Sequence, residues 1–185
     1  MNASALVNAC GESFRPLVQA ALLTGCRYGE LTALRCSDFD ETAQTIAIRA
    51  SKGGKPRHVV LGDDGAAFFT DHIVGRPSNA LVFARPDGTA WGKSHQFRPL
   101  ADACEAAKIV PPANFHILHH TYASHLVQAG AHLSVIAANL GHADTRMTEK
   151  HYAHLAPSHI ATAIREALPK LGIVQPRTVV ALKLA

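Results

Sequence analysis

The sequence lacks the features that mark membrane, exported and disulfide-rich proteins. Its 185 residues contain no run of about 20 apolar residues, which argues against a membrane-spanning helix. The N-terminus has no charged segment followed by an apolar one, so we expect a soluble, cytoplasmic protein. No C-x-x-C pair occurs, so neither a zinc knuckle nor a disulfide framework is predicted; the cysteines are Cys10, Cys26, Cys36 and Cys104.

The sequence also carries little net charge. The 18 lysines and arginines stand against 14 aspartates and glutamates, which gives a net charge of +4 and a pI near 9.0. This mild basic excess is compatible with a polyanionic partner but is too common to identify one. The hydrophobic content of 48% and the charged content of 17% are typical of a globular protein, and 185 residues are enough for one domain.

Hydrophobic spacing predicts a mainly helical domain with one small antiparallel sheet. Alternation over 44–50 and 57–61, with a glycine-containing turn between them, predicts a β-hairpin. Residues 80–83 are a candidate third strand, before a turn at 86–88. Apolar residues at helical spacing predict helices over 12–23, 27–34, 94–108, 115–129, 133–140, 145–154 and from Pro157 to the Pro169–Gly172 break. The expected fold class is therefore α+β, mainly helical.

Five short motifs follow one another along the chain. They are Thr24–Leu31 (Thr-Gly-Cys-Arg-Tyr-Gly-Glu-Leu), Ser51-Lys52, His116–Leu126, Leu140-Gly141-His142 and, ten residues later, Tyr152. This ordered set resembles the catalytic domain of tyrosine recombinases (phage integrases), over about residues 14–171. The resemblance implies the fold of that domain and an enzyme that cuts and rejoins DNA through a tyrosine.

The chemistry that the resemblance implies is attack by the phenolic oxygen of Tyr152 on a DNA phosphodiester. Negative charge builds on the phosphate oxygens in the transition state, and arginine suits them because it stays charged and presents a fork of donors. Arg27, His120 and His142 take the family positions that hold the phosphate or handle protons. The phosphotyrosyl bond keeps the energy of the broken bond, so neither a metal nor another cofactor is expected.

Two further residues complete the implied catalytic set. Lys52 has the position of the family's general acid, which protonates the departing 5′ oxygen, and Lys55 in the same turn is the alternative. Glu30 lies one helical turn after the arginine of its motif and is expected to orient the guanidinium. The remaining tyrosines, Tyr28 and Tyr122, lie inside motifs and are interpreted as structural.

One residue departs from the family's pattern. The middle motif of the family is His-x-x-Arg-His, and its arginine position holds His119. A histidine is shorter, has no fork of donors and, with an ordinary pKa near 6.5, is mostly neutral at pH 7.5. We therefore expect impaired cleavage, with a relative gain toward pH 6. The alternative function is a DNA-binding domain that has lost strand transfer, and a type IB topoisomerase is a weaker alternative with the same tyrosine chemistry.

Three histidines share one face of a predicted helix. His116, His119 and His120 have the spacing i, i+3, i+4, and zinc sites also use histidines four residues apart. The glutamate of H-E-x-x-H is missing and no acidic third ligand stands out, so no metal site is predicted. We interpret His116 as structural, and His151 and His154, which flank the tyrosine nucleophile, as solvated.

The expected partner is double-stranded DNA. With a net charge of only +4, the residues that contact phosphates must gather on one face, and the candidates are Arg27, Lys52, Arg57 and Arg146. The resemblance also implies a homo-oligomer, a tetramer, on DNA. We expect residues 1–185 to form a single catalytic domain without the N-terminal DNA-binding clamp domain of relatives. Its core should span about 12–171, and its C-terminal tail, 172–185, should pack on that core or on another molecule.

Overall fold

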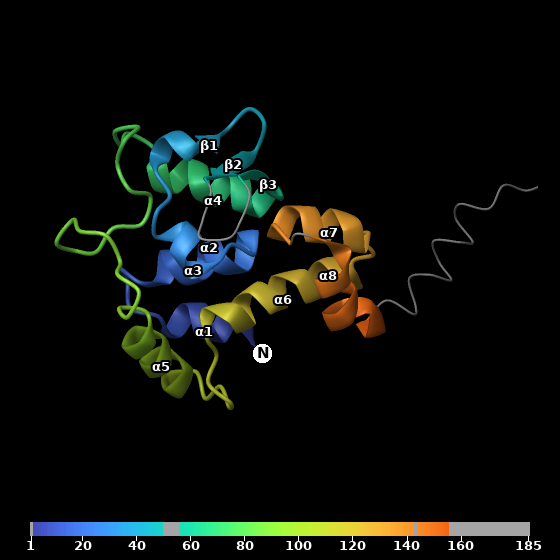
Figure 1. The fold of residues 1–185 in the computed structure, drawn as a ribbon. Coiled ribbons are helices and arrows are strands. Elements are labelled where there is room, and N and C mark those ends of the chain that lie inside the picture. The colour runs from blue at the N-terminus through green and yellow to red at the C-terminus, as the bar shows by residue number, and fades with distance from the viewer. Residues whose placement is uncertain (1, 50–55, 143, 156–185) are drawn as a thin grey trace, which may run out of the picture.

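The protein is mainly helical, with one small antiparallel sheet at one side (Figure 1). The computed structural model describes residues 2–49, 56–142 and 144–155. Its α-helices are α1 (Ala3–Ala9), α2 (Arg15–Thr24), α3 (Tyr28–Leu31), α4 (Asp63–Ile73), α5 (Phe97–Ala106), α6 (Phe115–Gln128), α7 (Leu133–Leu140) and α8 (Thr145–Tyr152), and its 3-10 helices are η1 (Cys36–Asp38) and η2 (Ala153–Leu155). The predicted α+β, mainly helical fold class is confirmed. Among these described residues, every helix is too short or too polar to span a bilayer.

The sheet contains the hairpin that the alternating residues predict. Its strands, in the spatial order β1-β2-β3, are β1 (Phe39–Asp40), β2 (Thr45–Ile48) and β3 (Arg57–Val60). Within the hairpin, Ile48 pairs with Arg57 at the turn end. Ile46 and Ile48 are buried, whereas the residues next to them in β2 are only partly covered, as expected for a strand with one face in the core. The turn residues 50–55, which include Lys52, lie outside the described residues.

The predicted third strand at 80–83 is wrong. Leu81 makes one isolated bridge to Arg35, and the third strand of the sheet is β1 instead. Val82 and Phe83 are 1% and 3% exposed, so this apolar run enters the core from a loop. Its hydrophobicity reflects burial, which a short apolar run cannot distinguish from pairing in a sheet.

Two helices, α1 and α4, escape the sequence-based prediction. The N-terminus of α1 is capped by Asn2, whose side-chain oxygen accepts from the backbone N–H of Ala5 at 3.1 Å. The first turn of α4 carries Asp63 and Asp64, whose charges favour a helix N-terminus. The first helix, α1, has only seven residues, and the buried face of α4 includes Gly65 and Ala66, which are too small to mark an apolar stripe. The last predicted helix, from Pro157, and the tail lie outside the described residues.

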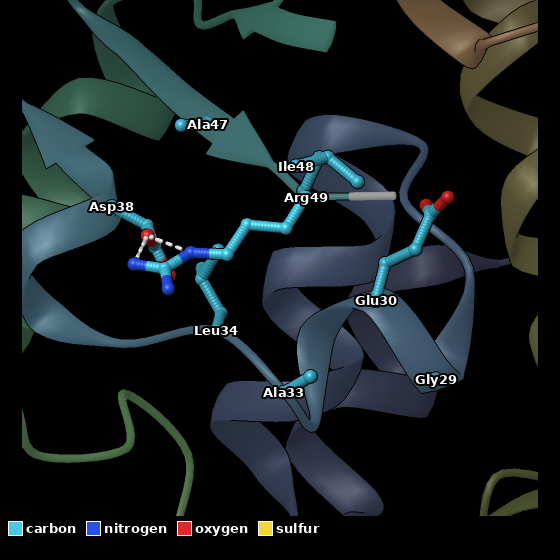
Figure 2. Close-up of a pocket in the computed structure, with 8 residues that line it drawn as sticks. All are labelled: Gly29, Glu30, Ala33, Leu34, Asp38, Ala47, Ile48 and Arg49. Carbon is cyan, nitrogen blue, oxygen red and sulfur yellow. Dashed lines mark hydrogen bonds and ion pairs between the residues drawn. The ribbon is translucent and has the colours of Figure 1, made fainter. Parts of the chain in front are cut away.

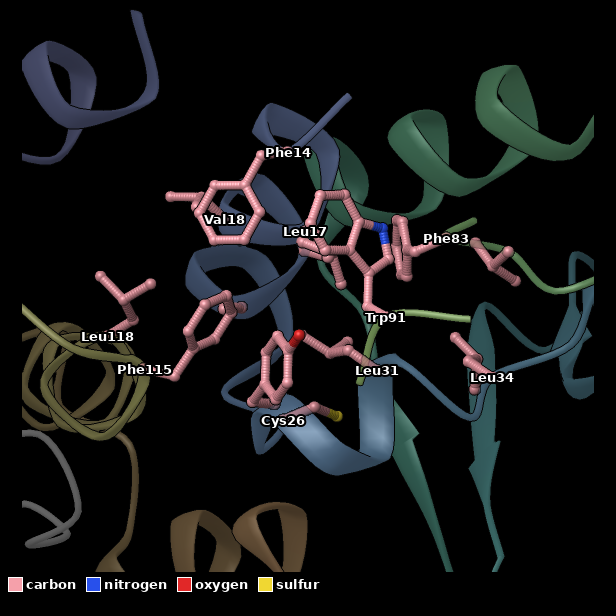
Figure 3. Packing of buried hydrophobic residues seen from close by; sticks show 14 of the residues in the cluster. Phe14, Leu17, Val18, Cys26, Leu31, Leu34, Phe83, Trp91, Phe115 and Leu118 are labelled. Carbon is pink, nitrogen blue, oxygen red and sulfur yellow. The ribbon is translucent and has the colours of Figure 1, made fainter. Parts of the chain in front are cut away.

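The main hydrophobic core lies between α2, α3, α6 and the segment around Trp91 (Figure 3). The rings of Phe14 and Trp91 have centroids 5.3 Å apart, and Tyr28 packs edge-on against Phe115 at 4.8 Å. Such tilted pairs are the preferred geometry of packed aromatic rings. A second, smaller cluster joins α6, α7 and α8, and its buried members are Ala123, Val127, Ile136, Leu140 and Tyr152. This cluster holds the end of α8, where the candidate nucleophile lies.

A shallow cavity of about 170 Å³ separates α3 from β2 (Figure 2). Arg49 reaches across it to Asp38, with Nη2 2.7 Å from Oδ1. Figure 2 shows the carboxylate of Glu30 turned away from this ion pair. The two acidic side chains of this region therefore serve different partners, and Glu30 faces the motifs of the candidate site.

Candidate active site

A cavity of about 310 Å³ forms where α6, α7 and α8 meet the N-terminus of α3. Its lining residues come from three of the five motifs and from α8, and they are Arg27, His116, His119, His120, Gly141, His142, Met147 and His151. The fold thus brings together side chains that the sequence separates widely. Tyr152 lies next to this cavity and is joined to it through His120.

Arg27 stands at the N-terminus of α3, and Glu30 holds it there. The Glu30 carboxylate accepts from the backbone N–H of Arg27 at 2.9 Å and from its guanidinium at 3.2 Å. Just before Arg27, Gly25 turns the chain with φ of +66°, and a Cβ there would lie 2.3 Å from the ring of Tyr122. The Arg27 side chain remains 45% exposed, so its guanidinium is accessible to an anion.

Glu30 is shared with a second arginine, Arg57 of β3. The two terminal nitrogens of Arg57 donate to the two carboxylate oxygens, both at 2.9 Å, and Nε donates to the carbonyl of Asn139 at 3.0 Å. Burial works to raise the pKa of Glu30, but Arg57 and Arg27 outweigh it and hold that pKa below its ordinary value. The Arg57 side chain is only 10% exposed. Instead of contributing to an open DNA-binding face, it is a buried partner of Glu30, because β3 packs against α7.

His120 connects the candidate nucleophile with the cavity. Its Nδ1 is hydrogen-bonded to the hydroxyl of Tyr152, and its Nε2 lies 2.9 Å from Nε2 of His116. Burial, reinforced by neighbouring histidines, lowers the pKa of His120, so the ring is neutral at pH 7.5 and one nitrogen can accept a proton. His116, interpreted from the sequence as structural, is exposed and lies at the cavity instead of in the core.

The side chain of Tyr152 is 2% exposed within the cluster between α6, α7 and α8. Burial raises its pKa to about 12, so the phenol stays protonated at neutral pH unless a base removes the proton. The hydroxyl groups of the other tyrosines have partners elsewhere. Tyr28 donates to the carbonyl of Gly92 at 2.9 Å, and Tyr122 accepts from Nδ2 of Asn139 at 2.8 Å. Their contacts agree with the structural interpretation.

His142 directly follows the end of α7. Gly141 ends the helix in the left-handed conformation, with φ of +70°, and the backbone N–H of His142 donates to the carbonyl of Ala137 at 3.0 Å. Nδ1 of the ring lies 2.8 Å from Oγ1 of Thr148 in α8, which fixes the ring orientation. Burial and the nearby charge of Arg27 lower the pKa of His142. The ring is therefore a neutral hydrogen-bonding group at pH 7.5.

His119 takes the family's arginine position and is only 4% exposed. Its Nδ1 is hydrogen-bonded to the carbonyl oxygen of Gly25. Because a carbonyl only accepts, Nδ1 carries the proton, and Nε2 of the neutral ring presents a lone pair. Burial lowers the pKa of His119 to about 4, and the charge of Arg27 acts in the same direction. The ordinary pKa near 6.5 assumed from the sequence is therefore wrong, and the neutral ring has a hydrogen-bond acceptor, not a donor, at Nε2.

Three further residues were considered from the sequence, namely Arg146, Lys52 and His151. Arg146 is 86% exposed and pairs with Asp144 at 2.7 Å. Lys52 lies outside the described residues, so its place relative to the cavity stays a prediction. His151, expected to be solvated, is exposed, but its ring also lines the cavity and lies 5.5 Å from that of His120. In the part of the chain that the structure describes, no three histidine, cysteine or acidic side chains are arranged to hold a metal ion.

Two polar residues of the site escape the sequence analysis. The backbone carbonyl of Asn139 accepts a hydrogen bond from Nε of Arg57, and the hydroxyl of Thr148 contacts the ring of His142. Neither belongs to a motif. The signal for Thr148 would be a polar residue on the apolar face of α8, since its side chain is fully buried.

Comparisons with known proteins agree with this geometry. The sequence model of the Phage integrase family matches residues 2–159. The tyrosine recombinase XerD of Mycobacterium tuberculosis (strain CDC 1551 / Oshkosh) is 31% identical over 143 residues, which cover 73% of this chain and 46% of the relative. The chain spans about half the length of the curated relatives it matches.

Solved structures share the fold. The catalytic domain of bacteriophage HP1 integrase superposes with a TM-score of 0.68 at 26% identity, covering 89% of this chain and 90% of that one. XerH site-specific recombinase, bound to its palindromic difH substrate in a post-cleavage complex, gives 0.65 at 20% identity, covering 89% and 51%. The likeness to XerH shows the fold alone. Because the family's sequence model matches most of the chain, the chain belongs to the phage integrase family.

Proposed function

We propose that this chain is the catalytic domain of a site-specific recombinase that cleaves and rejoins DNA through a 3′-phosphotyrosyl intermediate at Tyr152. The observation that carries the proposal is the meeting of Arg27, His142 and the His120–Tyr152 pair at one cavity. A phosphate there would face a guanidinium and an imidazole, with a phenol and its base beside them. These are the groups that phosphoryl transfer to a tyrosine requires.

Cleavage forms one bond and breaks one. The phenolic oxygen of Tyr152 attacks phosphorus, and its proton passes to Nδ1 of His120. The 5′ oxygen leaves with the electron pair of the broken bond and takes a proton from Lys52, the general acid that the family's motif assigns. Arg27 stabilises the charge that develops on the non-bridging oxygens. Rejoining reverses these steps with another 5′ hydroxyl as the attacking group, so no cofactor is consumed.

Tyr152 must leave its buried position before it attacks. Its side chain is 2% exposed and does not line the cavity. The hydroxyl contact with His120 and the contact between Thr148 and His142 keep α8 in its resting position. DNA binding is therefore coupled to a shift of α8, which lets the phenol reach the phosphate.

The proposed substrate is double-stranded DNA, and the proposed active assembly is a homo-oligomer. Exchange between two duplexes breaks four strands, and each break uses one tyrosine, which requires a tetramer on DNA. The structure of XerH with its difH substrate supports DNA as the partner. Because this chain spans about half the length of its curated relatives, its own hold on DNA is expected to be weak and dominated by phosphate contacts.

The second candidate is a DNA-binding domain that has lost strand transfer. The observation in its favour is His119, whose neutral ring presents a lone pair in place of the family's fork of donors. A lost donor slows the chemical step without removing the remaining contacts to DNA. Both candidate functions therefore include DNA binding, but only the first includes DNA cleavage.

The experiment that tests the proposal captures the covalent protein–DNA intermediate. A library of nicked duplexes with a randomised centre is incubated with the chain, and DNA that stays attached to denatured protein is recovered and sequenced. The nick releases a short product after cleavage, so the intermediate accumulates. We expect slow adduct formation by the unaltered chain and faster formation by His119→Arg.

Tyr152→Phe should abolish the adduct while leaving folding and non-covalent DNA binding intact. Tyr28→Phe is the matched control, because it removes a phenolic hydroxyl that donates to Gly92, and it should still form the adduct. An adduct that persists in Tyr152→Phe would overturn the assignment of the nucleophile. DNA binding without any adduct, in both the unaltered chain and His119→Arg, would favour the second candidate.

A further inference from the structure

Arg57 is a buried arginine that touches two parts of the active site at once. Its side chain is 10% exposed. On one side it donates to both carboxylate oxygens of Glu30, and on the other its Nε donates to the carbonyl of Asn139 in α7. The sequence suggests a phosphate contact for this residue, but its burial and its occupied donors point to another role.

The contact with Glu30 governs how Arg27 is held. Arg57 takes both oxygens at 2.9 Å, whereas the guanidinium of Arg27 takes one oxygen at 3.2 Å. Glu30 is 1% exposed, and such a buried carboxylate needs charge compensation. Because Arg57 supplies it, Glu30 can orient Arg27 without neutralising it fully.

The second contact governs the end of α7, directly before His142. The carbonyl of Asn139 belongs to the last turn of the helix, where carbonyls lack partners within the helix. The guanidinium of Arg57 also lies against Gly141, where a Cβ would be 2.8 Å from Nη1. The side chain of Asn139 strengthens this junction, since its Oδ1 accepts from the backbone N–H of Val60 at 2.8 Å.

We propose that Arg57 is a positioning residue that fixes Arg27 and His142 relative to each other. It acts on Arg27 through Glu30 and on His142 through Asn139 and Gly141. The test of this proposal by cleavage rate rests on the proposed strand cleavage. The test by binding of phosphate next to Arg27 and His142 does not. Arg57 would not contact the DNA phosphate itself.

Arg49 provides the matched control. It belongs to the same hairpin and also pairs with a carboxylate, Asp38, at 2.7 Å, but its side chain is 71% exposed and the pair faces away from Glu30 (Figure 2). Arg49→Met therefore removes an arginine from the hairpin without touching the site. Arg57→Met removes the positioning contacts, and Arg57→Lys keeps the charge but loses the fork of donors.

The first measurement is single-turnover adduct formation at saturating DNA, corrected for the folded fraction. We expect Arg57→Met and Arg57→Lys to slow it by about 10- to 100-fold, as misplaced catalytic groups do, with a smaller change in DNA affinity. Arg49→Met should react at the rate of the unaltered chain. An Arg57→Lys protein that cleaves as fast as Arg49→Met would overturn the proposal, because charge alone would then suffice.

A double variant separates positioning from simple loss of stability. Arg57→Met leaves the buried Glu30 carboxylate with less compensation, whereas Glu30→Gln/Arg57→Met removes both charges and should fold more readily. If Arg57 acts through Glu30, Arg57→Met should slow cleavage less in the Glu30→Gln background than in the unaltered chain. Equal slowing in both backgrounds would overturn the route through Glu30.

The second measurement does not require cleavage. Inorganic phosphate is titrated into each protein, and the ring signals of His142 are followed by NMR. We expect the response to phosphate to weaken in Arg57→Lys and to persist in Arg49→Met. Equal responses, or none in the unaltered chain, would overturn the positioning role. If the unaltered chain responds as expected but forms no adduct, the proposed strand transfer fails while the positioning role stands.

Discussion

Replacing His119 by arginine is the most direct test of whether the residue at position 119 limits DNA cleavage. In the unaltered chain, Nδ1 of His119 donates to the carbonyl of Gly25, so the neutral ring has only a lone pair at Nε2. His119→Arg introduces a permanent charge and a fork of donors at the wall of a cavity of about 310 Å³. We therefore expect faster formation of the phosphotyrosyl adduct.

The pKa of His119 sets the size of the effect. With a pKa of about 4, roughly one ring in 3,000 is protonated at pH 7.5, and charging the ring at that pH costs about 5 kcal/mol. One donor to a transition-state oxyanion supplies about 3–4 kcal/mol, or roughly 10²–10³ in rate. At pH 7.5 the cost is at least comparable with the gain, so protonation of the ring recovers little of the lost rate. We expect His119→Arg to cleave roughly 10²–10³ times faster at pH 7.5.

The pH dependence expected from the sequence also changes. An ordinary histidine would recover activity toward pH 6, but burial lowers the pKa of His119 to about 4. Charging the ring costs about 4 kcal/mol at pH 7 but only about 3 kcal/mol at pH 6, which is no more than the gain from one donor. The ratio of the two cleavage rates should therefore stay nearly constant between pH 8 and pH 7 and fall only toward pH 6. A ratio that already falls steeply between pH 8 and pH 7 would show that bound DNA raises the pKa of His119.

The assay is single-turnover adduct formation on a nicked duplex recovered from the library, at saturating DNA. His125→Arg is the control, because it adds the same charge to an exposed position on the same helix. It corrects for a general gain in DNA affinity, and thermal unfolding of each protein corrects for the folded fraction. Equal cleavage rates for the unaltered chain and His119→Arg at pH 7.5 would refute the reasoning.

Acid should lower the stability of this protein, and salt should lower its affinity for DNA. The pKa of His119 falls from 6.5 to about 4 on folding, so the unfolded chain binds the proton first, and the free energy of unfolding should drop by about 3 kcal/mol between pH 6.5 and pH 4. Urea unfolding of His119→Gln should show a smaller drop, and an identical pH dependence would contradict this. DNA affinity should fall steeply from about 50 to about 200 mM salt, and Arg146→Gln should reduce the salt slope by about one. Fluorescence anisotropy measures both, and an affinity independent of salt would argue against phosphate contacts.

Periodicity in the sequence predicts the elements around the site well, because those helices bury regular apolar faces. The helix predicted over 133–140 is α7, and that predicted over 115–129 contains α6. The prediction fails where a buried apolar run does not form a strand, or where a helix buries mainly small residues. Val82 and Phe83 are core residues on a loop, and α4 buries Gly65 and Ala66, which are too small to mark an apolar stripe.

The motifs predict which residues meet, but not how each one is held. The lone pair of His119 depends on the carbonyl of Gly25, which lies 94 residues earlier in the sequence. The burial of Arg57 depends on the end of α7, where Asn139 accepts its Nε–H. Such contacts join residues that no local pattern relates, so only the folded chain reveals them.

The charge balance of the cavity is the reason that we expect His119 to have a large effect on cleavage. Arg27 and Arg57 share the single carboxylate of Glu30, which leaves one net positive charge among these three groups. Burial lowers the pKa of both His119 and His142, so these rings add no charge at neutral pH. A scissile phosphate bound there would cancel that one charge, so within this set the further charge of the transition state would meet only neutral side chains. The remaining cation of the proposed mechanism is Lys52, which lies outside the described residues. An arginine at position 119 would supply the missing cation, whereas the histidine there turns its proton toward the protein's own backbone.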